Sequence, residues 1–127
     1  MPADGVPEDI RQFLREYVNS IEQLEILLRL FEIAPHAETS AEMAKALYSS
    51  VESISSRLET FANKGLVNRH VPEPWHYSLA SKESRRIGEL VRLYRERRVS
   101  IINEIFSNPI ASVQTFADAF IIGKKKE

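Results

Sequence analysis

Apolar residues recur every three to four positions through the first third of the chain, which is the period of a helix with one buried face. Between residues 8 and 18 the apolar side chains at this spacing are Ile10, Phe13, Leu14, Tyr17 and Val18. Residues 21–34, IEQLEILLRLFEIA, are apolar around most of the helix circumference and end before Pro35. We therefore expect an amphipathic helix followed by a helix in the middle of the core.

Two helix-start signatures come next. Thr39 precedes Glu42 by three residues, and Ser49 precedes Glu52 in the same way. In such a capping box the hydroxyl and the carboxylate each bind a backbone N–H group at the start of the helix. Two short helices joined by a tight connection predict a helix-turn-helix at about residues 40–63.

The second of these helices, residues 51–63, has a clear apolar face. Ile54, Leu58 and Phe61 lie three or four positions apart, so we expect them to point into the core. Gly65 follows at the place where a left-handed residue commonly ends a helix.

After Gly65 the hydrophobic period changes from helical to extended. The segments LVNRHV and WHYSLA are short and rich in residues that favour strands, and they are separated by Pro72-Glu73-Pro74. This pattern predicts a β-hairpin, or wing, over residues 66–80.

The last third of the chain returns to a helical pattern. A long helix is expected over about residues 82–107, broken by Asn108-Pro109, and a terminal helix over about 109–121. Residues 1–7, with two prolines and a glycine, are expected to form a flexible arm, and residues 123–127 a disordered tail.

Three helices followed by a hairpin is the element order of a winged helix. The predicted fold class is therefore mainly α (α+β): a winged helix-turn-helix with a short β-hairpin wing and extra N- and C-terminal helices. At 127 residues the chain has the usual length of one domain, which we expect over residues 8–122.

Composition excludes several kinds of chemistry. The chain has no cysteine, and His70 and His76 without a third ligand make a poor zinc site. The sequence contains no phosphate-binding glycine loop or nucleophile elbow, so we expect no enzyme, no metal and no cofactor. The N-terminus lacks a secretory pattern and no apolar run could span a membrane, which predicts a cytoplasmic protein.

Charge is unevenly distributed. Residues 1–63 contain five Lys/Arg against eleven Asp/Glu, whereas residues 64–127 contain twelve against seven. Such asymmetry is typical of a nucleic-acid-binding face, but it would equally suit a dimer in which opposite charges pair. Within residues 38–63 acidic side chains outnumber basic ones by four to two.

Residues 20–80 resemble the winged helix-turn-helix of MarR-like and ArsR-like bacterial transcription regulators. The resemblance rests on the pattern Leu58…Phe61…Lys64-Gly65-Leu66-Val67-Asn68-Arg69, which is similar to the end of a MarR-like recognition helix and the first wing strand. It implies a homodimeric regulator that reads the major groove of duplex DNA with helix 51–63.

The resemblance also implies which side chains face the DNA. MarR-like recognition helices often carry a Thr-Val-Ser-Arg stretch; Ser53 lies at the threonine, Ser55 at the serine and Ser56 at the arginine position. Arg57 is the next residue and could reach DNA or form a salt bridge on its own helix. We expect Ser53, Ser55, Ser56 and Arg57 to face the major groove.

Basic residues flanking this helix are the expected phosphate contacts: Lys64, Arg69, Lys82, Arg85 and Arg86. The wing departs from the MarR-like pattern, because its tip is Pro72-Glu73-Pro74-Trp75 where the family has an Asp-Arg-Arg type sequence. A glutamate there opposes contact with phosphates.

Two functions remain open at this point. The first is a DNA-binding regulator that dimerises through its terminal helices and long helix. The alternative is a winged helix that has lost DNA binding and serves as a protein-protein interaction module, with Trp75 as a possible anchor for the partner. Trp75 could instead fold over its own hairpin.

Overall fold

The computed structural model describes residues 5–70 and 74–107. The predicted terminal helix 109–121, the tail 123–127 and most of the wing tip lie outside this part. The elements in chain order are α1 (Glu8–Tyr17), α2 (Ile21–Ile33), β1 (Glu38–Thr39), α3 (Ser40–Leu47), α4 (Val51–Asn63), β2 (Val67–His70), β3 (His76–Leu79), α5 (Ser84–Glu96) and α6 (Arg98–Phe106). The chain divides into two compact units: residues 22–92, and residues 1–21 with 93–127.

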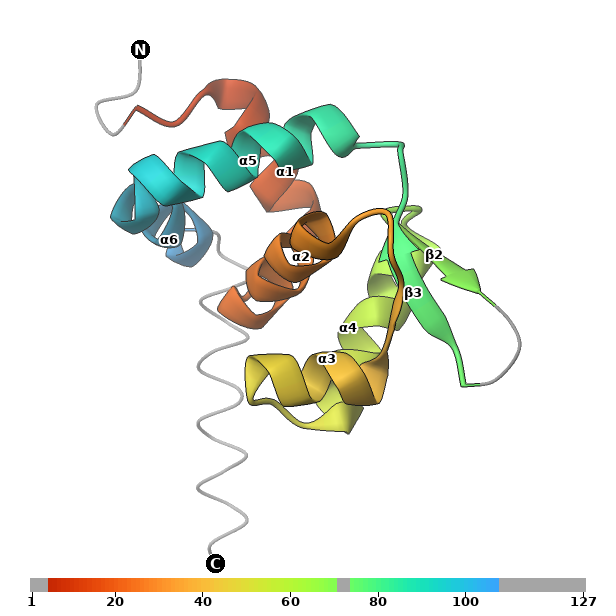
Figure 1. The fold of residues 1–127 in the computed structure, drawn as a ribbon. Helices are drawn as coiled ribbons and strands as arrows, with labels where there is room; N and C mark the ends of the chain where they lie inside the picture. Colours follow the sequence, from red (N-terminus) through yellow and green to blue (C-terminus); the bar gives the residue numbers. More distant parts are fainter. Residues whose placement is uncertain (1–4, 71–73, 108–127) are drawn as a thin grey trace, which may run out of the picture. The chain divides into compact units, whose positions relative to one another are not determined.

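The unit of residues 22–92 contains the predicted helix-turn-helix and wing. Helix α4 contacts both α3 and strand β2 of the hairpin (Figure 1). The apolar face of α4 is buried as expected, with Ile54, Leu58 and Phe61 fully inaccessible to solvent. The predicted fold class, a mainly helical winged helix with a small sheet, is confirmed.

The sheet has one strand more than the predicted hairpin. Its order is β1-β3-β2, all antiparallel, with Glu38 opposite Tyr77 and Val67 opposite Leu79. Strand β1 was not predicted, because two residues are too few to show the alternating pattern of a strand. The Arg29 guanidinium on α2 binds the Glu38 carboxylate in a bidentate pair at 3.1 and 2.5 Å, which fixes β1 against α2.

The helix ends follow the predicted signatures with one shift. The capping box of Thr39 and Glu42 is present in full. The N-cap of α4, however, is Ser50 and not Ser49: the Ser50 hydroxyl accepts from the Ser53 N–H at 3.1 Å. Ser49 and Ser50 are adjacent serines, so residue type alone does not show which of the two caps the helix.

Gly65 ends α4 in the way its position predicts. Its φ of 81° is in the left-handed region, where glycine carries no steric penalty. The Gly65 N–H donates to the Ala62 carbonyl and the Leu66 N–H to the Phe61 carbonyl, which together make a Schellman motif. Leu66 is fully buried as a result of this turn, so the chain enters β2 at a fixed angle.

The other unit contains α1 and α6, which contact each other. An ion pair joins Arg11 of α1 to Glu104 of α6 at 3.1 Å. Val6, within the segment expected to form a flexible arm, is fully buried. Residues 1–4 lie outside the described part.

The predicted continuous helix 82–107 is also wrong, because the chain leaves the helix at Arg97. This residue has φ −136° and ψ 53°, between the end of α5 and the start of α6. The Arg97 guanidinium lies beside Gly5, where an added Cβ would come within 2.8 Å of Arg97 Cζ. The N-terminal segment thus packs against the residue at which the helix is interrupted. No helix in the described part is long and apolar enough to cross a membrane.

Candidate nucleic-acid interface

The outward face of α4 begins at its first turn. Val51 is 44% exposed, and Glu52 and Ser56 are also exposed, while Ser53, Ser55 and Arg57 are half-buried. The four side chains expected to face a groove therefore do not share one environment.

Glu22, in the first turn of α2, binds two of the three half-buried side chains, Ser53 and Arg57. Its carboxylate accepts hydrogen bonds from the Ser49 and Ser53 hydroxyls and from Arg57 Nε, the last at 3.0 Å. Burial raises the pKa of Glu22, but the hydrogen bonds from Ser49, Ser53 and Arg57 outweigh it, so the pKa lies below its ordinary value. Glu22 is therefore held as a carboxylate at neutral pH.

This cluster engages two of the expected DNA contacts. The Ser53 hydroxyl and Arg57 Nε bind Glu22 of α2. The alternative partner expected for Arg57, an acid on its own helix, is not the one the structure shows. Ser53 and Arg57 thus fix the helix-turn-helix to α2. Ser55 and Ser56, the other two residues expected to face the DNA groove, are not part of the Glu22 cluster.

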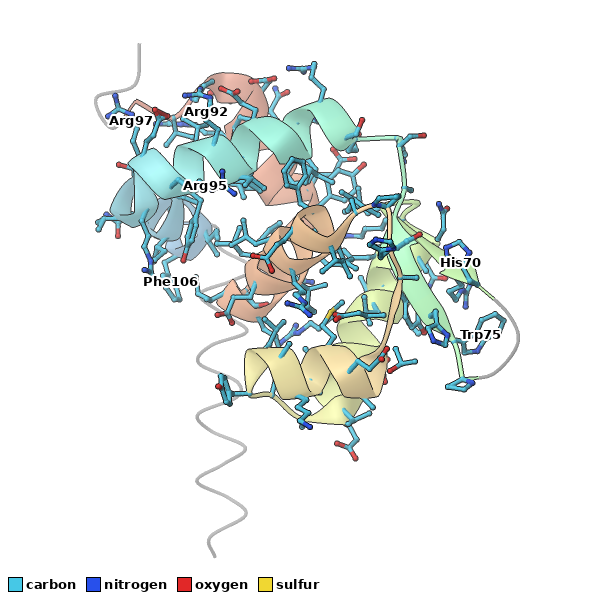
Figure 2. All side chains as sticks on the ribbon, viewed as in Figure 1. His70, Trp75, Arg92, Arg95, Arg97 and Phe106 are labelled. Carbon is cyan, nitrogen blue, oxygen red and sulfur yellow. The ribbon has the colours of Figure 1, made fainter. Side chains whose placement is uncertain are left out.

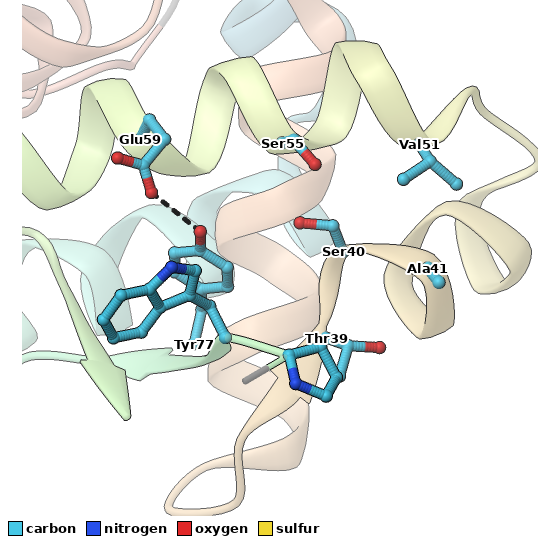
Figure 3. Close-up of a pocket in the computed structure, with 9 residues that line it drawn as sticks. Thr39, Ser40, Ala41, Val51, Ser55, Glu59 and Tyr77 are labelled. Carbon is cyan, nitrogen blue, oxygen red and sulfur yellow. Dashed lines mark hydrogen bonds between the residues drawn. The ribbon is translucent and has the colours of Figure 1, made fainter. Parts of the chain in front are cut away.

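A groove of about 520 Å³ runs between the start of α3, α4 and the wing (Figure 3). Its lining residues are Thr39, Ser40, Ala41, Val51, Ser55, Glu59, Pro74, Trp75 and Tyr77. The sequence analysis had placed only Ser55 of these at an interface with DNA. The groove's one described ionisable carboxylate is Glu59.

Glu59 is held by two partners. The Tyr77 hydroxyl donates to it at 2.7 Å, shown dashed in Figure 3, and Arg69 pairs with it at 2.8 Å. Burial and the Glu59 carboxylate raise the pKa of Tyr77 to about 12, so the phenol remains a donor at neutral pH. Arg69, expected to bind phosphate, is thus paired with an acid on α4.

Trp75 contacts its own hairpin. The Arg69 guanidinium lies over the indole ring, 5.7 Å from its centroid, which is cation–π geometry. Figure 2 shows Trp75 and His70 on the wing. Of the two roles expected for Trp75, the structure shows packing on the hairpin, and Trp75 remains 38% exposed.

The remaining expected phosphate contacts lie on either side of the wing in the sequence. Lys64, Lys82 and Arg85 are exposed, and Lys82 Nζ donates to the Lys64 carbonyl at 3.1 Å, which draws Lys82 to the end of α4. Arg86 is largely buried and pairs with Glu83 at 2.7 Å. The structure thus brings Lys64 and Lys82 together.

Two features escaped the sequence analysis. Glu22 lies 27 to 35 residues before the side chains that it binds, so no local pattern connects them. Tyr48, in the turn between α3 and α4, is 97% exposed. Among the described residues, no three His, Asp or Glu side chains gather as a metal-binding group.

Solved structures with similar folds were found. A MarR family protein from Bacillus stearothermophilus is 22% identical, with a TM-score of 0.54 over 94% of this chain and 84% of that one. MepR of Staphylococcus aureus, solved with DNA, is 17% identical, with a TM-score of 0.58 over 94% and 88%. The MarR family regulator SPO1453 from Silicibacter pomeroyi is 13% identical, with a TM-score of 0.56 over 90% and 82%.

The fold is a winged helix similar to that of these MarR family proteins. No family model matches the sequence, and no curated protein matches it. The likeness covers 94% of this chain in the comparisons with the Bacillus stearothermophilus protein and with MepR. In this fold α4 is the second helix of the helix-turn-helix, and the β2–β3 hairpin is the wing.

Proposed function

We propose that this chain is a DNA-binding transcription regulator of the MarR type that acts in the cytoplasm as a homodimer. The observation that carries the proposal is the MarR-type winged helix itself, in which α4 exposes its N-terminal turns beside a groove and a wing. Residues near the N-terminus of a recognition helix are those that reach base edges. One similar structure, that of MepR, contains DNA.

The described side chains divide into three roles. Ser55 and Ser56, on the outward part of α4, would contact bases. Lys64, Lys82 and Arg85 would contact phosphates. Ser53, Arg57 and Arg86 would support the interface from within, because each binds a carboxylate of its own chain. Glu22 binds Ser53 and Arg57, and Glu83 binds Arg86.

Arg69 has a conditional role. Its guanidinium is held between the Glu59 carboxylate and the Trp75 ring. Approach of a phosphate would compete with Glu59 for this guanidinium, since both are anions that accept the same donors. Arg69 would then contribute to DNA binding less than an arginine whose neighbours are neutral.

The experiment that tests the function is fluorescence anisotropy of the purified full chain with labelled random-sequence duplex DNA. Random sequence is suitable because phosphate contacts supply non-specific affinity without regard to base sequence. Selection of bound duplexes from a random library then shows whether α4 prefers a defined site, as a transcription regulator must.

A second candidate function is a protein-interaction module. The observation that favours it is charge: Glu59 lies in the groove, and Arg57, one of two basic residues in the acidic helix-turn-helix, is paired with Glu22. A chain with this function would not bind duplex DNA even at low salt, so the same anisotropy experiment separates the two.

Glu59→Gln is expected to strengthen binding to random duplex DNA by about threefold to tenfold at low salt, because it removes an anion from the interface and releases Arg69 to a phosphate. The slope of log affinity against log salt should become steeper by about 0.9, the contribution of one phosphate contact. Glutamine preserves the side-chain shape and can still accept the Tyr77 hydroxyl, so the fold should be retained. Anisotropy titrations of both proteins measure the difference.

Glu25→Gln is the matched control, because Glu25 is exposed on α2 and lines no part of the groove. An equal gain in both variants would indicate a general effect of net charge. A loss of DNA affinity in Glu59→Gln would show that Glu59 holds Arg69 in the orientation that DNA requires.

A further inference from the structure

Tyr48 is the most exposed large apolar side chain in the described part of the chain. It is 97% exposed and lies in the turn of the helix-turn-helix, after Leu47 and before the N-cap residue Ser50. A side chain so exposed gains almost nothing from packing, because folding removes little of its apolar area from water.

The backbone at Tyr48 also favours a different residue. Its φ of 55° and ψ of 46° are left-handed, a conformation that costs a tyrosine steric energy and a glycine none. The turn itself is closed by backbone hydrogen bonds, including one from the Ser49 N–H to the Ala44 carbonyl at 2.9 Å. Neither the turn nor the core therefore explains a tyrosine at this position.

The position of Tyr48 indicates a use for its hydroxyl. It stands three residues before Val51, the first residue of α4, which is itself 44% exposed. The charged side chains nearest in sequence are Lys45, one turn back on α3, and Glu52 on α4, and both are exposed. In a helix-turn-helix bound to DNA, the first helix crosses the phosphate backbone and the N-terminal residues of the second contact base edges. The turn between the two helices therefore lies close to the backbone.

We propose that Tyr48 is a DNA-anchoring residue whose phenol hydroxyl donates a hydrogen bond to a backbone phosphate where α4 enters the major groove. This inference rests on the proposed DNA-binding function. Tyrosine hydroxyls are among the donors that position proteins on phosphates, and such a contact carries no base specificity. Tyr48 therefore contributes to affinity for every duplex, random sequence included.

Two variants test this role. Tyr48→Gly removes the side chain and relieves the left-handed backbone, so the unfolding midpoint is expected to change by less than about 3 °C. Affinity for random duplex DNA at low salt is expected to fall by about fivefold to tenfold. Tyr48→Phe keeps the ring and removes only the hydroxyl, and it is expected to weaken binding by at least about threefold.

Phe31→Ala is the control, because Phe31 is an exposed aromatic residue on α2 outside the helix-turn-helix. The Phe31→Ala variant is expected to bind DNA with wild-type affinity. Wild-type binding of both Tyr48 variants would overturn the proposal while leaving the DNA-binding function intact. Loss in Tyr48→Gly but not in Tyr48→Phe would overturn the phosphate hydrogen bond. Failure of the wild-type chain to bind DNA would overturn the proposed function, and this inference with it.

Discussion

Replacing Lys64, Lys82 and Arg85 together with alanine is expected to weaken binding to random duplex DNA by about a hundredfold or more at about 0.1 M salt. Each cation that contacts a phosphate releases condensed counterions and contributes about 0.9 to the slope of log affinity against log salt. The triple variant should therefore have a slope shallower by about 2.7. Anisotropy titrations over a salt series measure both quantities.

These three residues are suitable because they are exposed in the structure, so alanine removes little packing. Lys82 also donates a hydrogen bond to the carbonyl of Lys64, the residue that caps the C-terminus of α4. Circular dichroism should therefore be measured alongside binding, to show that the fold is retained. The expected spectrum and unfolding midpoint are close to those of the wild-type chain.

The matched control removes three exposed cations from the other unit: Arg15, Arg95 and Arg98. It changes the net charge equally and is expected to alter DNA affinity by no more than a few fold. Equal losses in the two triple variants would mean that overall charge, and not a phosphate-binding surface around α4, governs the interaction.

Glu22→Ala is expected to destabilise the fold by about 2–3 kcal/mol at neutral pH. The change removes the shared acceptor of the Ser49 hydroxyl, the Ser53 hydroxyl and Arg57 Nε. The Arg57 side chain is only 25% exposed, so it loses its anion in a partly desolvated place. Urea unfolding followed by circular dichroism measures the change in free energy.

The pH dependence gives this prediction a second readout. The pKa of Glu22 is lowered in the folded chain from its ordinary value of 4.5. Its contribution to stability is therefore present above the unfolded-state pKa and is lost as pH falls through the folded-state pKa. The difference between wild type and Glu22→Ala should narrow as pH falls below about 4.5.

Glu25→Ala is the control for this pair, because it removes an exposed carboxylate from the same helix. It is expected to change stability by less than about 0.5 kcal/mol. A loss in Glu22→Ala no larger than this, or one that does not depend on pH, would contradict the role of the Glu22 cluster.

The helix-turn-helix was predictable because its determinants are local. The capping box joins Thr39 and Glu42, which lie within one helical turn of each other. Gly65 ends α4 through its own left-handed conformation. The buried residues of α4 recur at the helical period. Such signals can be read without knowledge of the tertiary fold.

The interface was less predictable because its determinants are not local. Ser53 and Arg57 occupy the expected positions on α4, yet their polar groups turn to Glu22, more than 30 residues away in sequence. Arg69 is similarly taken by Glu59. A family pattern specifies where a residue stands on a helix, whereas the nearest carboxylate determines what its side chain binds.

The break at Arg97 is a third case. The apolar stripe predicted one helix over residues 82–107, although the position of Arg98 in that stripe is polar. In the structure the chain leaves the helix at Arg97, beside the positive-φ Gly5. A contact between residues more than 90 positions apart therefore accompanies a boundary that the local helical pattern does not show.

The central claim is that this winged helix binds DNA through phosphate contacts around α4. The most direct test is anisotropy of the wild-type chain with random duplex DNA from about 20 to about 200 mM salt. With at least three contacts, affinity should fall by roughly 500-fold or more across that range. No binding at the lowest salt, or binding that does not change with salt, would contradict the claim.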